Sequence, residues 1–210
     1  MRLKAGQKIV MIGDSITDAG RREIEPPYGV GYMALVRSFV TARYPELGLT
    51  WENRGIGGDT VRHLDARWTT DVIDERPDVL TVMIGINDVW RAFGEKVHEA
   101  VPEDEYRETL TRLINSARQG DGPDLYVGSP YMIEADRNDP MRAAMDSRGA
   151  IAREVASEVG ATFIDVQAAF DRVLASTPNT DWADDRIHPN QPGHAVIAIE
   201  FLRAFGIDLS

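Results

Sequence analysis

Five short apolar segments alternate with stretches of helical periodicity, and this alternation constrains the fold more than any other feature of the chain. The expected strands are Lys8–Ile12, Leu49–Asn53, Val79–Ile84, Leu125–Gly128 and Thr162–Val166. Apolar residues three and four positions apart predict amphipathic helices between the strands. A chain that alternates strands with helices forms a parallel sheet covered on both faces, because right-handed crossovers place the helices there. We therefore predict a three-layer α/β/α sandwich with a five-stranded parallel sheet.

The expected helices are defined by their apolar stripes. One stripe consists of Tyr32, Leu35, Val36, Phe39 and Val40, and another of Val61, Leu64, Trp68 and Val72. A final helix is expected from about Pro192 to Phe205. No linker, repeat or low-complexity tract divides the 210 residues, so we expect a single domain over residues 1–210.

Charge and cysteine content exclude several classes of function. The formal net charge of −11 repels phosphate backbones and anionic lipid, so neither a nucleic acid nor a membrane is an expected partner. The chain has no cysteine, which excludes disulfides and thiolate metal sites. The apolar run Ile9–Ile12 is far too short for a secretory signal or a membrane span, and we expect a cytoplasmic location.

Polar and glycine residues follow three successive expected strands. Ser15, Gly58 and Asn87 each lie just past a strand end. In parallel sheets ligands bind at the carboxyl ends of the strands, so these residues are expected to meet at one site. This argument depends on position alone.

The residues of this expected site are suited to acyl transfer. A serine hydroxyl needs a neighbouring base, and His188, with Asp185 three residues before it, supplies a base and a carboxylate to orient it. The backbone N–H groups of Ser15 and Gly58 and the amide of Asn87 are candidate donors to an oxyanion. On spacing alone, Gly57 serves as well as Gly58. Each motif by itself also fits a turn, a helix cap or a solvated loop.

Together the motifs resemble a known family. Gly13-Asp14-Ser15, Gly55-Ile56-Gly57-Gly58, Gly85-Ile86-Asn87-Asp88 and Asp185-Arg186-Ile187-His188 resemble the four blocks of the SGNH hydrolases, also called GDSL esterases and lipases. The family's name letters fall on Ser15, Gly58, Asn87 and His188, which favours Gly58 over Gly57. The resemblance implies a flavodoxin-like fold and a serine esterase with Ser15 as nucleophile, His188 as base and Asp185 as its partner.

Within that family the sequence is more similar to bacterial intracellular acetylxylan esterases. The stretches that carry this likeness are Gly13–Asp18, Met83–Arg91, Asp139–Arg142 and Gln167–Asp171. It implies an O-acetylated carbohydrate substrate, such as an acetylated xylo-oligosaccharide, and a homo-oligomer. One departure is Asp184, which stands where those esterases have an aromatic residue before the catalytic aspartate.

Further side chains are candidates for substrate binding. Tyr28, Trp90, Tyr131 and Trp182 are candidates for stacking on a sugar, since aromatic faces suit the apolar face of a pyranose, although each also fits a packing role. Trp182 is a candidate replacement for the aromatic residue missing at Asp184. Asp14 is a candidate substrate contact, with the capping of a turn as its alternative role.

The sequence implies neither a metal nor a cofactor. His188 and His194 lack zinc-binding spacing, and the glycine turn lacks the third glycine of a dinucleotide fingerprint. The first alternative function is a lysophospholipase, thioesterase or aryl esterase with the same chemistry. The others belong to different classes: a carbohydrate-binding protein without turnover, and a nucleotide-binding protein of flavodoxin-like fold.

Overall fold

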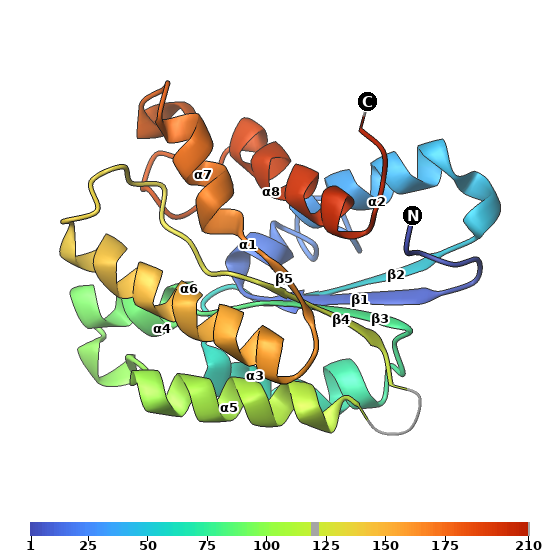
Figure 1. The fold of residues 1–210 in the computed structure, drawn as a ribbon, viewed down its shortest axis with the longest axis horizontal. Coiled ribbons are helices and arrows are strands. Elements are labelled where there is room, and N and C mark those ends of the chain that lie inside the picture. Colours follow the sequence, from blue (N-terminus) through green and yellow to red (C-terminus); the bar gives the residue numbers. More distant parts are fainter. Residues whose placement is uncertain (119–121, 210) are drawn as a thin grey trace.

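The computed structural model describes residues 1–118 and 122–209 and contains a parallel sheet between two layers of helices (Figure 1). Its strands are β1 (Lys8–Gly13), β2 (Thr50–Gly55), β3 (Val79–Met83), β4 (Asp124–Gly128) and β5 (Thr162–Ile164). They lie in the order β2-β1-β3-β4-β5, so the chain reverses its direction of winding between β1 and β3. The predicted five-stranded α/β/α sandwich is confirmed.

Helices cover both faces of the sheet (Figure 1). One layer holds α1 (Ser15–Asp18), α2 (Tyr32–Arg43), α7 (Val166–Leu174) and α8 (Gln191–Ala204), and the other holds α3 (Val61–Trp68), α5 (Glu103–Ser116) and α6 (Pro140–Glu158). A short helix, α4 (Ile86–Trp90), follows β3. Shorter segments are the 3₁₀ helices Pro45–Leu47, Arg91–Phe93, Val97–Glu99 and Asn179–Asp181 and the π-helix Thr69–Ile73.

Each face of the sheet has its own hydrophobic core, because successive side chains of a strand point to opposite faces. Ile9 and Met11 of β1 pack with α2 and α8, whereas Val10 and Ile12 pack with α3 and α5. All four side chains are fully buried, and each contributes about 1.5–3 kcal/mol of transfer free energy. The apolar runs in the sequence are continuous for this reason: both faces of the sheet are covered.

The burial of the predicted helical stripes is confirmed for α3 but only in part for α2. Val61, Leu64, Trp68 and Val72 are all buried, and the stripe continues through the π-helix that follows α3. In α2 the prediction is wrong for Phe39, whose surface is 39% exposed. The buried stripe of α2 is narrower than its apolar sequence, because only part of the helix faces α8 and the sheet.

The segment after Ile164 differs from the prediction. The expected strand runs to Val166, but β5 ends at Ile164 and Val166 begins α7. The side chain of Asp165 caps this helix by accepting a hydrogen bond from the N–H of Ala168 (3.0 Å). The hydroxyl of Ser129, at the end of β4, accepts hydrogen bonds from the N–H groups of Val166 (3.0 Å) and Gln167 (3.2 Å), so the start of α7 is held by Asp165 and Ser129 together.

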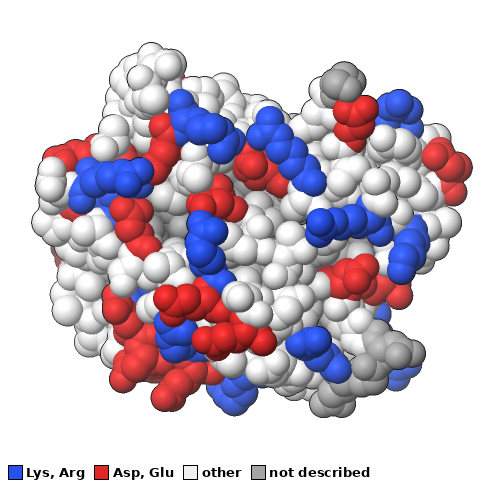
Figure 2. Space-filling model, viewed as in Figure 1, with Lys and Arg blue, Asp and Glu red and all other residues white. Residues whose placement is uncertain are grey.

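The surface carries charges of both signs. In the same view as Figure 1, Figure 2 shows Lys and Arg side chains lying among Asp and Glu. Ion pairs join neighbouring helices, as between Arg112 of α5 and Asp65 of α3 (2.9 Å). Within residues 1–118 and 122–209, no helix combines the length and the apolar character needed to cross a membrane.

Candidate active site

Ser15 lies in the turn that follows the central strand β1. The chain leaves β1 at Gly13, and the carboxylate of Asp14 caps α1 by accepting a hydrogen bond from the N–H of Ile16 (3.0 Å). This cap fixes the short helix of which Ser15 is the first residue. Ser15 consequently lies at the carboxyl edge of the sheet, beside the β1/β3 position at which the winding reverses.

A close contact between α1 and β2 fixes the position of Ser15 further. A Cβ added at Gly55 would lie 2.1 Å from the backbone nitrogen of Asp18, so only glycine fits at this crossing. Asn53, also on β2, donates its amide to the carbonyl of Thr17 (2.8 Å). The turn that carries Ser15 is thus held between two neighbouring strands.

His188 lies within hydrogen-bond distance of Ser15. Its Nε2 is 3.0 Å from the Oγ of Ser15, and its Nδ1 is 2.6 Å from Oδ2 of Asp185. The other carboxylate oxygen of Asp185 accepts hydrogen bonds from the backbone N–H groups of Ile187 (3.0 Å) and His188 (2.7 Å). Serine, histidine and aspartate thus form a continuous hydrogen-bonded series.

The charge of Asp185 is maintained by these bonds. Partial burial raises the pKa of Asp185, but the hydrogen bonds from the ring and backbone of His188 and from Ile187 outweigh it. The net result is a pKa below the ordinary value of an aspartate. An ionised Asp185 requires the hydrogen on Nδ1 of His188, which leaves Nε2 free to accept the proton of Ser15.

Three N–H donors face the same space. Gly57 donates its N–H to Asp18 (3.3 Å), but no hydrogen bond within the described residues uses the N–H of Ser15 or Gly58. Gly58 has a φ of +83°, a conformation that glycine adopts without strain. The amide nitrogen of Asn87 donates one hydrogen to the carbonyl of Asp59 (2.9 Å), which leaves its second hydrogen for a ligand.

One cavity of about 350 Å³ connects these groups. It is lined by Ser15, Gly58, Asn87, Trp90, Arg91, Gly94, Glu95, Lys96 and His188. The ring of Trp90 lies edge-on to that of His188, with centroids 5.8 Å apart, and 39% of the Trp90 surface is exposed. Trp90 is therefore the one predicted aromatic candidate that this cavity includes.

Two arginines support the site and were not identified from the sequence. Arg91 donates a hydrogen bond to the carbonyl of Gly58 (3.0 Å) and pairs with Glu99 (3.0 Å). Arg67 donates to the carbonyls of Arg54 (2.8 Å) and Gly13 (3.0 Å), near the ends of β2 and β1. Arg91 lies in a stretch that resembles the family, but no local pattern marks either arginine as a backbone ligand.

Two predicted substrate contacts, Asp14 and Tyr131, have buried side chains, and their contact with a substrate stays a prediction. Asp14 is 2% exposed and caps α1, and burial, together with the charges of Asp88 and Asp59, raises its pKa to about 7. Tyr131 is 1% exposed, stacks on Phe170 and donates its hydroxyl to a backbone carbonyl. Neither side chain reaches the cavity.

Two further aromatic candidates lie elsewhere. Tyr28 packs against the core beneath α2 and α8, with the guanidinium of Arg37 3.9 Å from its ring centroid. Trp182 packs against the same core and donates its indole N–H to Thr177 (2.8 Å). Trp182 is not among the residues that line the cavity, and its role as a replacement for the aromatic residue missing at Asp184 stays a prediction.

The other histidine near the site is structural. His194 is buried and accepts a hydrogen bond from the N–H of Tyr32 (3.2 Å). Its burial, helped by the nearby His188, lowers its pKa to about 4, so it is neutral. Within the described ranges, no group of three or more His, Cys, Asp or Glu residues is arranged to hold a metal ion.

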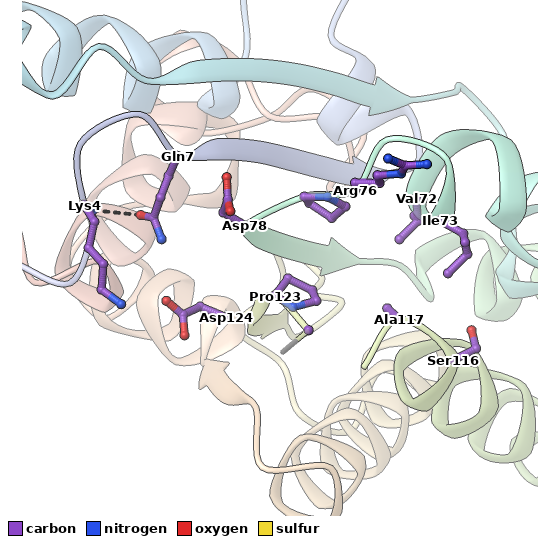
Figure 3. A pocket seen from close by; sticks show the side chains of 12 residues that line it. Lys4, Gln7, Val72, Ile73, Arg76, Asp78, Ser116, Ala117, Pro123 and Asp124 are labelled. Carbon is purple, nitrogen blue, oxygen red and sulfur yellow. Dashed lines mark hydrogen bonds between the residues drawn. The ribbon is translucent and has the colours of Figure 1, made fainter. Parts of the chain in front are cut away.

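A cavity of about 560 Å³ lies at the opposite end of the sheet (Figure 3). Gln7 and Asp78, which line it, precede β1 and β3. Its serine, Ser116, donates its hydroxyl to the carbonyl of Leu113 (2.7 Å). The acyl-transfer groups described above therefore lie at the carboxyl edge and not in this larger cavity.

The fold and the site define a serine hydrolase of the α/β/α type, and the sequence agrees. A family model described as GDSL-like Lipase/Acylhydrolase matches residues 11–196. The chain belongs to this family.

Individual relatives match over the whole chain. An acetylxylan esterase of Geobacillus stearothermophilus is 41% identical, with 99% of this chain and 98% of the relative covered. The crystal structure of that esterase, Axe2, superposes with a TM-score of 0.95 at 40% identity, covering 99% of this chain and 98% of that one. LAE5, an alpha/beta hydrolase from the metagenome of Lake Arreo in Spain, gives a TM-score of 0.92 at 45% identity, with 98% of each chain covered.

Proposed function

We propose that this protein is a serine esterase that removes acetyl groups from acetylated xylo-oligosaccharides through an acyl-enzyme on Ser15. The observation that carries the proposal is the series Ser15 Oγ, His188 Nε2 (3.0 Å), His188 Nδ1 and Asp185 Oδ2 (2.6 Å) beside a cavity that Ser15, Gly58 and Asn87 line. The carbohydrate assignment is supported by the acetylxylan esterase relative. Solved structures of Axe2 include Ser, Asp and His variants described as catalytic mutants.

In the first half of the reaction, Ser15 attacks the acetyl carbonyl while Nε2 of His188 takes the hydroxyl proton. Charge develops on the carbonyl oxygen, and the N–H groups of Ser15 and Gly58 and the amide of Asn87 stabilise it. His188 then returns the proton to the sugar oxygen as the carbon–oxygen bond of the ester breaks. The products are a free sugar hydroxyl and acetyl-Ser15.

In the second half, water replaces the sugar. His188 removes a proton from the water as it attacks acetyl-Ser15, and the same donors stabilise the second tetrahedral intermediate. The proton returns to the oxygen of Ser15, and acetate leaves. Asp185 remains ionised throughout and stabilises the imidazolium that forms twice in each cycle.

The test compares wild-type protein with Ser15→Ala. We expect acetate release from acetylated xylo-oligosaccharides by the wild type, with loss of at least about 10³-fold in the variant, since the nucleophile is gone. Nitrophenyl esters of increasing chain length are measured in parallel. Hydrolysis of long-chain esters in preference to the acetylated sugar would favour the lysophospholipase or thioesterase alternative. No Ser15-dependent hydrolysis of any ester would reject the esterase, leaving a binding protein without turnover.

Two further properties stay predictions. The homo-oligomer expected from the sequence is tested by light scattering coupled to size-exclusion chromatography, where a monomer mass of 23.3 kDa would contradict it. The cytoplasmic location is tested by cell fractionation, and the single-domain prediction by one cooperative transition in calorimetry.

A further inference from the structure

Arg186, between Asp185 and His188, has a backbone conformation that is unfavourable for its residue type. Its φ is +67°, in the left-handed region that side chains with a Cβ rarely adopt. Such a conformation persists only where the surroundings hold it. The loop therefore depends on contacts made by Arg186 itself.

Those contacts come from the segment between β4 and α6. One guanidinium nitrogen of Arg186, Nη1, donates to the carboxylates of Glu134 (2.8 Å) and Asp139 (3.0 Å). The carbonyl of Arg186 accepts a hydrogen bond from the N–H of Ile133 (2.8 Å). Both the side chain and the backbone of Arg186 are thus bound to residues 133–139.

Side chains of α6 and α7 fix this segment to the core. The guanidinium of Arg142 is 2% exposed; it donates to the carbonyl of Glu134 and pairs with Asp146 (2.8 Å) and Asp171 (2.9 Å). Gln167 accepts a hydrogen bond from the N–H of Met132 (2.7 Å) and donates to its carbonyl (3.0 Å). The segment thus has several direct attachments to the helices on either side of it.

These attachments give a structural role to two stretches that resemble acetylxylan esterases but take no part in the reaction. Asp139–Arg142 supplies a partner of Arg186 and the buried arginine, and Gln167–Asp171 supplies the partners of Met132 and Arg142. Together they connect the hydrophobic core to the loop that carries the base.

The loop requires such a connection because its functional side chains are open to water. The side chains of Asp185 and His188 are 47% and 43% exposed, so little packing restrains them. A displacement of about 1 Å at a reacting group can lower a rate by about 10²-fold. The position of His188 relative to Ser15 therefore depends on its neighbours in the loop: Ile187, which is buried beside Met132, and Arg186, which makes the polar contacts described above.

We propose that Arg186 is a positioning residue, and that Glu134 and Asp139 act through it to hold Asp185 and His188 in register with Ser15. The proposal rests on the proposed function, in which Ser15, His188 and Asp185 carry out the reaction. His188 acts in both acylation and deacylation, so loosening the loop slows both steps together. The expected signature is a lower kcat with little change in KM.

The test uses Arg186→Ala and Arg186→Lys, with Arg112→Ala as the matched control. Like Arg186, Arg112 makes two charged hydrogen bonds, but both go to one carboxylate, that of Asp65 (both 2.9 Å), on the exposed faces of α5 and α3. We expect Arg186→Ala to lose about 10- to 100-fold in kcat on nitrophenyl acetate with KM within about twofold. A lysine should restore most of the activity, since a single nitrogen makes both contacts in the wild type. Arg112→Ala should match the wild type.

A second pair of variants separates positioning from folding. Arg186→Gly removes the guanidinium but also the unfavourable Cβ, so we expect it to lose activity like Arg186→Ala while unfolding at a higher temperature than that variant. Glu134→Gln keeps the shape of one partner and should give a smaller loss. If Arg186→Ala does not fold, these two variants carry the test.

Proton NMR measures the order of the Asp185–His188 loop independently of catalytic activity. The Nδ1 proton of His188 should give a resolved downfield resonance in the wild type and in Arg112→Ala, broadened in Arg186→Ala and Arg186→Gly. Wild-type kcat in Arg186→Ala and Arg186→Gly, a change confined to KM, or an unaltered resonance in both would overturn the proposal. If wild-type protein hydrolyses no ester, the proposed function fails, and the resonance alone decides whether Arg186 orders the loop.

Discussion

The two halves of the candidate site are held in different ways. Ser15, Gly58 and Asn87 follow β1, β2 and β3, and their backbone is fixed by strand pairing and close helix contacts. Asp185 and His188 follow no strand, and their loop before α8 is bound by side chains of residues 131–139. In this protein, the edge of the sheet positions the candidate oxyanion donors, whereas the position of the general base His188 depends on contacts between loops.

The largest loss of kcat is expected from a substitution in the loop that carries Asp185 and His188. Asp185→Asn should lower kcat by about 10³- to 10⁴-fold, because an amide no longer holds the required tautomer of His188 or stabilises its cation. Asp184→Asn is the matched control, since it changes the neighbouring exposed carboxylate, and it should stay within about twofold of wild type. Steady-state kinetics on nitrophenyl acetate measures both. A similar loss in both variants would mean that general charge, and not the pairing with His188, is responsible.

In the strand-end half, Asn87→Ala should cost less. Loss of one oxyanion donor typically lowers kcat by about 10²- to 10³-fold, with little change in substrate binding. Asn115→Ala, an exposed asparagine on α5, serves as the control for removal of an amide. If kcat is unchanged in Asn87→Ala, the oxyanion is stabilised by backbone N–H groups alone.

The buried carboxyl group of Asp14, in the strand-end half of the site, predicts a stability that depends on pH. Burial raises the pKa of Asp14 to about 7, so between about pH 4 and pH 7 the folded state keeps a proton that the unfolded state releases. Stability should fall as pH rises through this range and the contribution of Asp14 should then level off. Asp14→Asn should reduce this slope, to which the buried Asp88, whose pKa burial raises to about 6, also contributes, and should gain about 2–4 kcal/mol at pH 8, measured by urea unfolding. Parallel pH profiles for the two proteins would contradict the assignment.

The smallest effect is expected at Gly58. An alanine at φ +83° costs about 1–2 kcal/mol, and its Cβ would lie 3.4 Å from Arg91. Gly6→Ala is the control: Gly6 has a φ of +77°, with nothing near its added Cβ. Calorimetry should show similar losses of stability for both, whereas only Gly58→Ala should lose kcat, by several-fold. Equal activity in both variants would show that the Gly58 turn tolerates a side chain.

The sequence predicted the part of the molecule that depends on local pattern. All five strands were placed within about two residues of their observed ends, since a strand covered on both faces is a continuous apolar run. The residues at the strand ends followed from the same pattern. Ser15, Gly58, Asn87, Trp90 and His188 do line one cavity.

The sequence is less informative where segments distant in the chain meet. Tyr131 has the same local appearance as Trp90, but it lies in the core and stacks on Phe170 of α7. The start of α7 is held by Asp165, which resembles any aspartate after a strand, and by Ser129, which is distant in the sequence. Arg67, Arg91 and Arg186 bind backbone or carboxylates far along the chain, and no periodicity reports such partners.

The contact between Ser15 and His188 joins residues 173 positions apart in the chain. During synthesis, Ser15 therefore emerges from the ribosome long before His188 has been translated. A nascent chain that ends before His188 lacks the general base. Cleavage anywhere between the two residues abolishes activity if the fragments separate, because Ser15 and His188 are then on different fragments. Ester hydrolysis by this protein is for that reason a sensitive reporter of complete synthesis and folding.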